Sequence, residues 1–229
     1  MQKVVVLTGA GMSAESGIKT FRDHDGLWEN HDVTKVASPE GWAKNRDLVL
    51  DFYNKRRAQL TEVKPNAGHK GLVELEEHFD VQIITQNVDD LHERAGSNKV
   101  LHLHGELNKV RSTQYPELVY HWEKDLKMGD TCEKGYQLRP HIVWFGEGVP
   151  KIEPAVKLTS EADIIVIIGT SMQVYPAASL VAYAPRTAPI FYVDPRPSIN
   201  YELQARRHLR TIEATATVGV QRLKRELLG

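Results

Sequence analysis

The stretch VVVLTGAGMSAESGIKTFRDHDGLW, residues 4–28, decides the fold of this chain. Its first four residues, Val4 to Leu7, are apolar and predict a buried strand. The spacing Gly9-x-Gly11-x-x-Ala14 then fits a dinucleotide-binding fingerprint, in which a strand turns into a helix. Such a turn exposes backbone N–H groups that suit a pyrophosphate. On its own this pattern also arises by chance, and the residues that follow it are more informative.

Those residues differ from an ordinary Rossmann unit, in which a second strand ends in an acid that binds the ribose. Here residues 19–28, KTFRDHDGLW, are polar and typical of a loop. We therefore expect a loop that folds over the ligand and brings an aromatic side chain and an arginine with it. The missing strand also argues against an ordinary dehydrogenase.

Composition limits the class of protein. A chain of 229 residues predicts one large domain, or one large domain with a small module, and 41% hydrophobic residues suffice for a substantial core. The net charge of −1, from 29 basic and 30 acidic residues, gives no electrostatic reason to expect nucleic acid or membrane binding. The longest apolar run, Ile164 to Ile168, is too short to span a bilayer.

The ends and the cysteine content point to a cellular compartment. The first predicted strand begins near Lys3, which leaves no room for a signal peptide. The single cysteine, Cys132, excludes an intrachain disulfide framework. We therefore expect a soluble cytoplasmic protein.

Periodicity predicts an α/β fold, a Rossmann-like parallel sheet with helices on both faces and a small inserted module. Helical patterns cover residues 66–79 and 216–228. Apolar runs predict strands at Val4–Leu7, Val81–Thr85, Val100–His102, Ile142–Trp144, Ile164–Ile168 and Ile190–Val193.

We expect a single catalytic domain over residues 1–229. The large part comprises about 1–23, 63–107 and 141–229, and the small module about 24–62 and 108–140. Residues 108–140 are polar and weakly periodic, and we therefore assign them to the small module rather than to the large part.

Five motifs occur in order along nearly the whole chain and together resemble the sirtuin family. The opening stretch is similar to that family's NAD-binding signature. Residues 85–92, TQNVDDLH, are similar to its TQNxDxLH, and His104-Gly105 to its catalytic HG motif. Residues 139–147, RPHIVWFGE, and 169–176, GTSMQVYP, also match the family's patterns.

Two histidines, His102 and His104, alternate with leucines, so they share one face of an extended segment. A metal site at H-x-H lacks a third ligand with clear spacing, and a structural histidine is the common alternative. The resemblance implies that His104 is the general base. A histidine suits this task because its ordinary pKa of about 6.5 permits proton removal near neutrality.

Asn87 and Asp89 follow a predicted strand, at the end where open α/β sheets bind ligands. Capping of a helix is the alternative for both, and a plain turn is the alternative for the Gly-Thr-Ser that follows Ile168. The resemblance implies a catalytic role for Asn87 and an NAD site around it. The NAD-binding residues that it implies are Gly9, Ala10, Gly11, Ser13, Ala14, Ile18, Phe21, Arg22, Trp28, Gln86, Asn87, Val88, Asp89, His104, Gly169, Thr170, Ser171, Val174, Asp194 and Ala216, with Ala214 as an alternative to the last.

Val143, Phe145, Gly146 and Glu147 are similar to the strand to which a peptide substrate adds by main-chain hydrogen bonds, although an ordinary core strand fits too. Tyr53 and Arg56 lie on one helical face. By themselves they suit a half-buried tyrosine and a surface arginine.

In position, however, Tyr53 and Arg56 resemble the YxxR of sirtuins that accept acidic acyl chains, and Ala37 resembles the small residue that widens the pocket of that class. A guanidinium with a phenol donor suits a carboxylate. We therefore favour succinyl- or malonyl-lysine over acetyl-lysine.

Two features depart from the family's pattern. Sirtuins generally hold a structural zinc with four cysteines, and one cysteine cannot do so; we therefore expect no zinc, and His121 and His141 do not replace the ligands. Asp194 also stands where the family usually has asparagine near the adenosine ribose, and an acid can bind ribose hydroxyls.

The resemblance implies an NAD-dependent protein-lysine deacylase that consumes NAD, takes acylated proteins as substrates and yields nicotinamide and O-acyl-ADP-ribose. An ADP-ribosyltransferase on the same fold remains an alternative. A non-catalytic NAD or ADP-ribose binding module is another, although it predicts a lost histidine or a lost Asn87-x-Asp89. The sequence leaves the oligomeric state and the target proteins open.

Overall fold

The computed structural model describes residues 1–19, 27–28 and 31–229, with the backbone alone described at 27 and 28. Its larger part is built on a six-stranded parallel sheet of order β11-β10-β9-β1-β4-β5. The strands are β1 (Lys3–Thr8), β4 (Asp80–Thr85), β5 (Val100–His102), β9 (Ile164–Ile168), β10 (Ile190–Val193) and β11 (Leu209–Ile212). The predicted parallel α/β sheet is confirmed.

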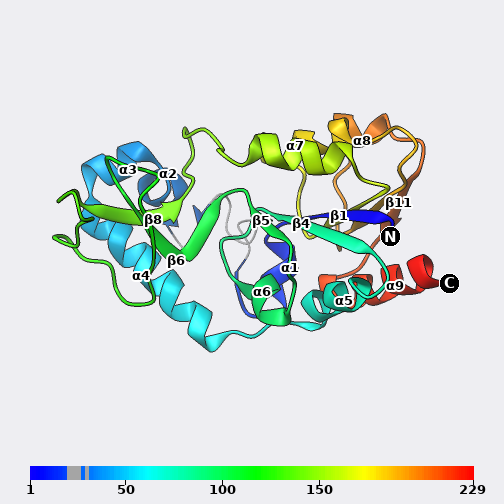
Figure 1. Cartoon of the computed structure of the whole chain (residues 1–229), viewed down its shortest axis with the longest axis horizontal. Helices are drawn as coiled ribbons and strands as arrows, with labels where there is room; N and C mark the ends of the chain where they lie inside the picture. Colours follow the sequence, from blue (N-terminus) through cyan, green and yellow to red (C-terminus); the bar gives the residue numbers. More distant parts are fainter. Residues whose placement is uncertain (20–26, 29–30) are drawn as a thin grey trace.

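Alternate residues of β1 face opposite sides of the sheet, and each side carries its own apolar core. Val4 and Val6 pack in one cluster, while Val5 and Leu7 pack in the other. Helices α5 (Ala67–Leu75) and α9 (Ala216–Leu228) cover the first side. The second side is covered by α7 (Ile152–Ser160), the 3₁₀ helix η2 (Ala177–Tyr183) and α8 (Tyr201–Gln204). Figure 1 shows these helices as layers above and below the sheet.

The predicted helices agree with the structure except at one end. Helix α9 covers the predicted residues 216–228, but α5 stops at Leu75, four residues short of the predicted end, and continues as turns. Asn66 caps α5, since its Oδ1 accepts hydrogen bonds from the N–H groups of Gly68 and His69. The short helices α1 (Gly11–Ala14) and α6 (Leu91–Ala95) follow β1 and β4.

One predicted strand is wrong. Residues 143 and 144 lie outside any strand, because β8 (Leu138–Ile142) ends at the first residue of that prediction. The chain turns after it because the Glu147 N–H donates to the Trp144 carbonyl, while the Trp144 N–H donates to the Glu147 carboxylate. Strand β11 was not predicted, since half of its residues are polar.

A second, smaller body lies at the other end of the molecule (Figure 1). Its antiparallel sheet has the order β7-β6-β8, with β6 (Gly105–Ser112) and β7 (Val119–His121) beside β8. Helices α2 (Val33–Val36), α3 (Pro39–Lys44) and α4 (Arg46–Glu62) pack with this sheet around a third apolar cluster. Strands β2 (Leu27–Trp28) and β3 (His31–Asp32) form a separate pair. The three-stranded sheet of the small body thus runs from residue 105 to residue 142.

The strand order creates a crevice at the edge of the sheet where the strands end. From β1 the chain proceeds through β4 and β5 on one side, and later through β9, β10 and β11 on the other. Ligands bind where the strand order reverses in this way, outside the carboxyl ends of the strands. The predicted motifs after β1, β4 and β9 all lie at that edge.

Candidate active site

A cavity of about 510 Å³ opens at the carboxyl ends of these strands, within the range of small-molecule sites. Twenty-two of the residues expected to bind NAD or substrate line it. They are Gly9, Ala10, Gly11, Ser13, Ala14, Ile18, Ala37, Gln86, Asn87, Val88, Asp89, His104, Val143, Phe145, Gly146, Glu147, Gly169, Thr170, Ser171, Val174, Asp194 and Ala216.

The glycine turn after β1 serves a different purpose from the one expected. The Gly9 and Gly11 N–H groups donate to the carbonyls of Ile168 and Gly169, at 3.1 and 2.8 Å, so they are not available to a pyrophosphate. A Cβ on Gly11 would lie 2.7 Å from the Gly169 Cα. The two glycines therefore allow the loops after β1 and β9 to touch.

Asn87 is held from two sides at the end of β4. Its N–H donates to Thr85 Oγ1 at 3.0 Å, and its Nδ2 donates to Ser13 Oγ at 3.1 Å. Ser13 in turn donates to Asp89, whose pKa is raised by burial against the opposing effect of these hydrogen bonds. Asp89 Oδ1 also accepts from the Leu91 N–H at 3.1 Å, so it binds the first residue of α6, whose N-cap is Asp90.

His104 has the geometry of a general base. Its Nδ1 lies 3.1 Å from the Gln86 carbonyl, an acceptor, so Nδ1 carries the proton and Nε2 keeps its lone pair. Burial lowers the pKa of His104, and the bond to Gln86 opposes this effect. The ring is therefore neutral and able to take a proton near pH 7.

The loops that follow β9 and β10 also line the cavity. Gln86 Nε2 donates to Thr170 Oγ1 at 3.1 Å, which ties the β4 and β9 loops together. Buried Asp194 accepts a 2.8 Å hydrogen bond at Oδ1 from the Arg196 N–H. Ala216, rather than the alternative Ala214, lines the cavity.

The expected substrate segment, residues 143–147, lines the cavity and is held by backbone and ionic contacts. The N–H groups of Val143 and Phe145 donate to the carbonyls of His104 and Ala37, at 2.9 and 3.0 Å. The Glu147 carboxylate pairs with Arg139 at 2.6 Å and Arg111 at 3.1 Å. Glu147 therefore anchors this segment, and its charge is already neutralised.

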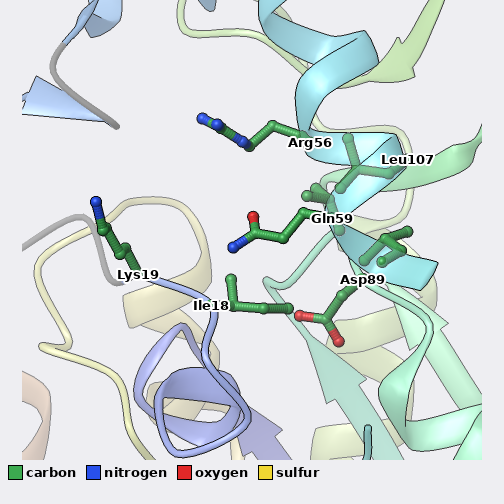
Figure 2. A pocket seen from close by; sticks show the side chains of 8 residues that line it. Ile18, Lys19, Arg56, Gln59, Asp89 and Leu107 are labelled. Atoms are coloured by element: carbon green, nitrogen blue, oxygen red, sulfur yellow. The ribbon is translucent and has the colours of Figure 1, made fainter. Parts of the chain in front are cut away.

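Neither Tyr53 nor Arg56 is among the described residues that line the main cavity. Tyr53 is fully buried, and its hydroxyl accepts a 3.0 Å hydrogen bond from Trp144 Nε1. Arg56 lines a smaller adjoining pocket of about 30 Å³ together with Lys19 and Gln59. Figure 2 shows Arg56 and Gln59 projecting from α4 toward the segment that carries Ile18 and Lys19.

Three expected NAD-binding residues fall outside this description. Phe21 and Arg22 lie outside the described residues, and the structure describes the backbone alone at Trp28. The cavity also has lining residues that sequence reasoning missed, among them Lys19, Trp144, Arg196 and Thr215. Each lies one or two positions from an expected site residue in the sequence. This proximity was the only sequence feature that could have indicated them.

Polar and aromatic contacts surround the single cysteine of the small body, beside its apolar cluster. Buried Cys132 donates from Sγ to Ser112 Oγ at 3.4 Å. The Tyr115 and Tyr136 rings meet edge to face at 5.4 Å, and Lys134 Nζ lies 3.8 Å from the Tyr115 ring centre. In the described part of the chain, no three His, Cys, Asp or Glu side chains are arranged to hold a metal ion.

The fold and the cavity, which His104 lines, define a dinucleotide-binding α/β protein. The model of the Sir2 family matches residues 9–176. A Helicobacter pylori relative, called NAD-dependent protein deacylase, is 63% identical over 196 residues, which are 86% of each chain. A Bacteroides thetaiotaomicron relative of the same name is 53% identical over all of this chain and 99% of its own. The chain belongs to the Sir2 family.

Solved structures agree with this assignment. The crystal structure of a Sir2 homologue in complex with NAD has a TM-score of 0.87 at 38% identity, covering 99% of this chain and 89% of its own. A mutant Sir2 homologue in complex with ADP-ribose has a TM-score of 0.86 at 36% identity, covering 99% and 93%. The predicted family, fold and NAD-dependent deacylase class are confirmed. Among the described helices, none has the length and apolar character needed to cross a membrane.

Proposed function

We propose that this NAD-dependent deacylase removes acidic acyl groups, succinyl or malonyl, from lysine side chains in preference to acetyl. The observation that carries the proposal is the small pocket around Arg56. It shares Ile18, Lys19, Val88 and Asp89 with the main cavity, so the two spaces adjoin. An acyl chain on a lysine in the main cavity would therefore reach Arg56.

The chemistry of the small pocket supports an acidic tip. Arg56 and Lys19 contribute two cationic side chains to its lining, with one amide from Gln59. Asp89 is the opposing charge, but donors from Leu91 and Ser13 already bind its carboxylate. A space of about 30 Å³ suits a carboxylate better than a longer apolar chain.

The residues of the cavity fit NAD as co-substrate. Polar groups from the ends of β1, β4, β9 and β10 converge on one space of sufficient volume. When bound, NAD supplies the ADP-ribose that accepts the acyl group, and nicotinamide is released. We assign the binding of its nicotinamide half to Gln86, Asn87 and Asp89, and that of its adenosine end to Asp194 and Ala216.

His104 performs the proton transfer in this proposal. Its Nδ1–H stays bonded to the Gln86 carbonyl, so Nε2 takes a proton from a ribose hydroxyl at the cavity. The N–H groups of Val143 and Phe145 bind the carbonyls of His104 and Ala37. These bonds fix the substrate segment relative to His104.

The test compares kcat/KM for succinyl-lysine and acetyl-lysine forms of one peptide with NAD. We expect the wild type to prefer succinyl, and Arg56→Met to lose about tenfold or more on succinyl alone, as loss of a charge-assisted contact predicts. Lys55→Met is the matched control, since Lys55 is 64% exposed and pairs with Asp51.

An acetyl preference that Arg56→Met leaves unchanged would refute the acidic-acyl proposal while keeping the deacylase. NAD-dependent nicotinamide release without loss of an acyl group would instead favour the ADP-ribosyltransferase.

A further inference from the structure

Two histidines hold two consecutive carbonyls of the loop that follows β4. His104 Nδ1 lies 3.1 Å from the Gln86 carbonyl, and His102 Nδ1 lies 3.2 Å from the Asn87 carbonyl. His104 lines the main cavity, whereas His102 is not part of its lining among the described residues. The function proposed above therefore uses His104 and leaves His102 without a role.

The second nitrogen of His102 also faces an oxygen. Nε2 lies 2.7 Å from Glu93 Oε1 on α6, and the His102 side chain is only 8% exposed. A carbonyl and a carboxylate both accept hydrogen bonds, so both bonds form only when both ring nitrogens carry a proton. The geometry thus requires a charged imidazolium.

The charges around His102 favour the same state. Burial lowers the pKa of His102, but the Glu93 hydrogen bond and the charges of Glu93 and Glu106 raise it overall. Burial raises the pKa of Glu93, and the bond and charge of His102, with Lys109, lower it overall. Asp89 and His92 also interact with His102. Asp89 adds a further acid, and burial keeps the pKa of His92 well below its usual value.

We propose that His102, charged and braced by Glu93, is a positioning residue that fixes the Asn87 carbonyl and so holds Asn87 and Asp89 in place for NAD. This inference rests on the proposed NAD-binding role of those two residues. Their side chains meet at Ser13 only while the loop keeps its shape. When the ring loses one proton, the remaining proton stays on Nε2 against the Glu93 carboxylate, which is the stronger acceptor. The bond from Nδ1 to the Asn87 carbonyl is then lost, so NAD affinity falls at alkaline pH.

Three variants separate this role from simple packing. His102→Asn places an amide donor where Nδ1 stands, which keeps the bond to Asn87 but cannot titrate. His102→Leu removes both bonds. Glu93→Gln keeps an acceptor at a side chain that is 42% exposed, but it removes the charge that holds the proton. Glu153→Gln, an exposed acid on α7 across the sheet, is the matched control.

The experiment measures the Kd for NAD by calorimetry from pH 6 to 9, and the protonation of the His102 ring by ¹⁵N NMR, both on the whole chain. We expect both ring nitrogens of the wild type to carry protons at pH 7, and the Kd to rise above the titration midpoint of the ring. In Glu93→Gln both midpoints fall by about one pH unit or more. The Kd of His102→Asn stays flat with pH and near the wild-type value, while His102→Leu binds at least about tenfold more weakly.

A neutral His102 ring at pH 7, or midpoints that Glu93→Gln leaves in place, would overturn the proposal. Equal loss of affinity in His102→Asn and His102→Leu would do so as well. A failure of deacylation appears separately in the peptide assay, since neither readout here depends on turnover.

Discussion

Single side chains of this protein find partners far away in the sequence. Tyr53 and Trp144 are separated by 91 residues, yet both are buried and joined by one hydrogen bond. The resemblance suggested Tyr53 as a contact for the acyl tip, but its hydroxyl oxygen already accepts from the indole. Its position therefore links α4 to Trp144, which lines the main cavity.

Tyr53→Phe should destabilise the fold by about 1–3 kcal/mol, because it leaves the buried Trp144 Nε1 without this acceptor. The measurement is urea unfolding followed by circular dichroism. Tyr120→Phe is the matched control, since the Tyr120 hydroxyl is buried and has no hydrogen-bond partner in the described part of the chain. Equal unfolding free energies for the two variants would contradict the structural role of Tyr53.

At the scale of elements, the contact between the loops after β1 and β9 defines the site. Periodicity predicted both strands, and the structure adds that Gly11 N–H donates to the Gly169 carbonyl. Strands β6 and β8 were harder to predict, because residues 108–140 are polar and β6 has a register shift between Gly105 and Val110. Pairing partners, rather than local pattern, stabilise these strands.

Gly11→Ala should weaken NAD binding at least about tenfold and lower stability by about 1–3 kcal/mol, because its Cβ would meet the Gly169 backbone at 2.7 Å. Calorimetry with NAD and urea unfolding measure the two effects. Gly148→Ala serves as the control, since nothing lies within 4 Å of the place that its new methyl group would take. If both variants bind NAD like the wild type, the loop contact does not shape the site.

For the whole molecule, buried histidines connect stability to pH. Burial lowers the pKa of His69 to about 4, and it lowers the pKa of His92 well below its usual value. Their rings pack edge to face at 4.9 Å. His69 Nδ1 also accepts from the Asn66 N–H, so a proton there would break the cap of α5.

The free energy of unfolding should therefore fall as the pH falls from about 6.5 toward 4, because the unfolded chain binds more protons in that window. At about 1.4 kcal/mol per pKa unit, His69 accounts for on the order of 3 kcal/mol. His69→Gln, which keeps an acceptor at the cap, should reduce this slope, and exposed His78→Gln should not. Urea unfolding at several pH values measures the slope of the unfolding free energy against pH. Equal slopes for the wild type and His69→Gln would refute the assignment to His69.

The sequence by itself determined the central strands, the order of the motifs and the family, because buried runs such as residues 164–168 and motifs such as His104-Gly105 are local patterns. It also identified twenty-two residues that line one cavity. Only the tertiary structure decided that the glycine N–H groups bind the loop after β9, that Tyr53 binds Trp144, and that Glu93 braces His102. These hydrogen bonds join residues that are far apart in the sequence. Such bonds produce no local sequence pattern, so the sequence alone does not reveal them.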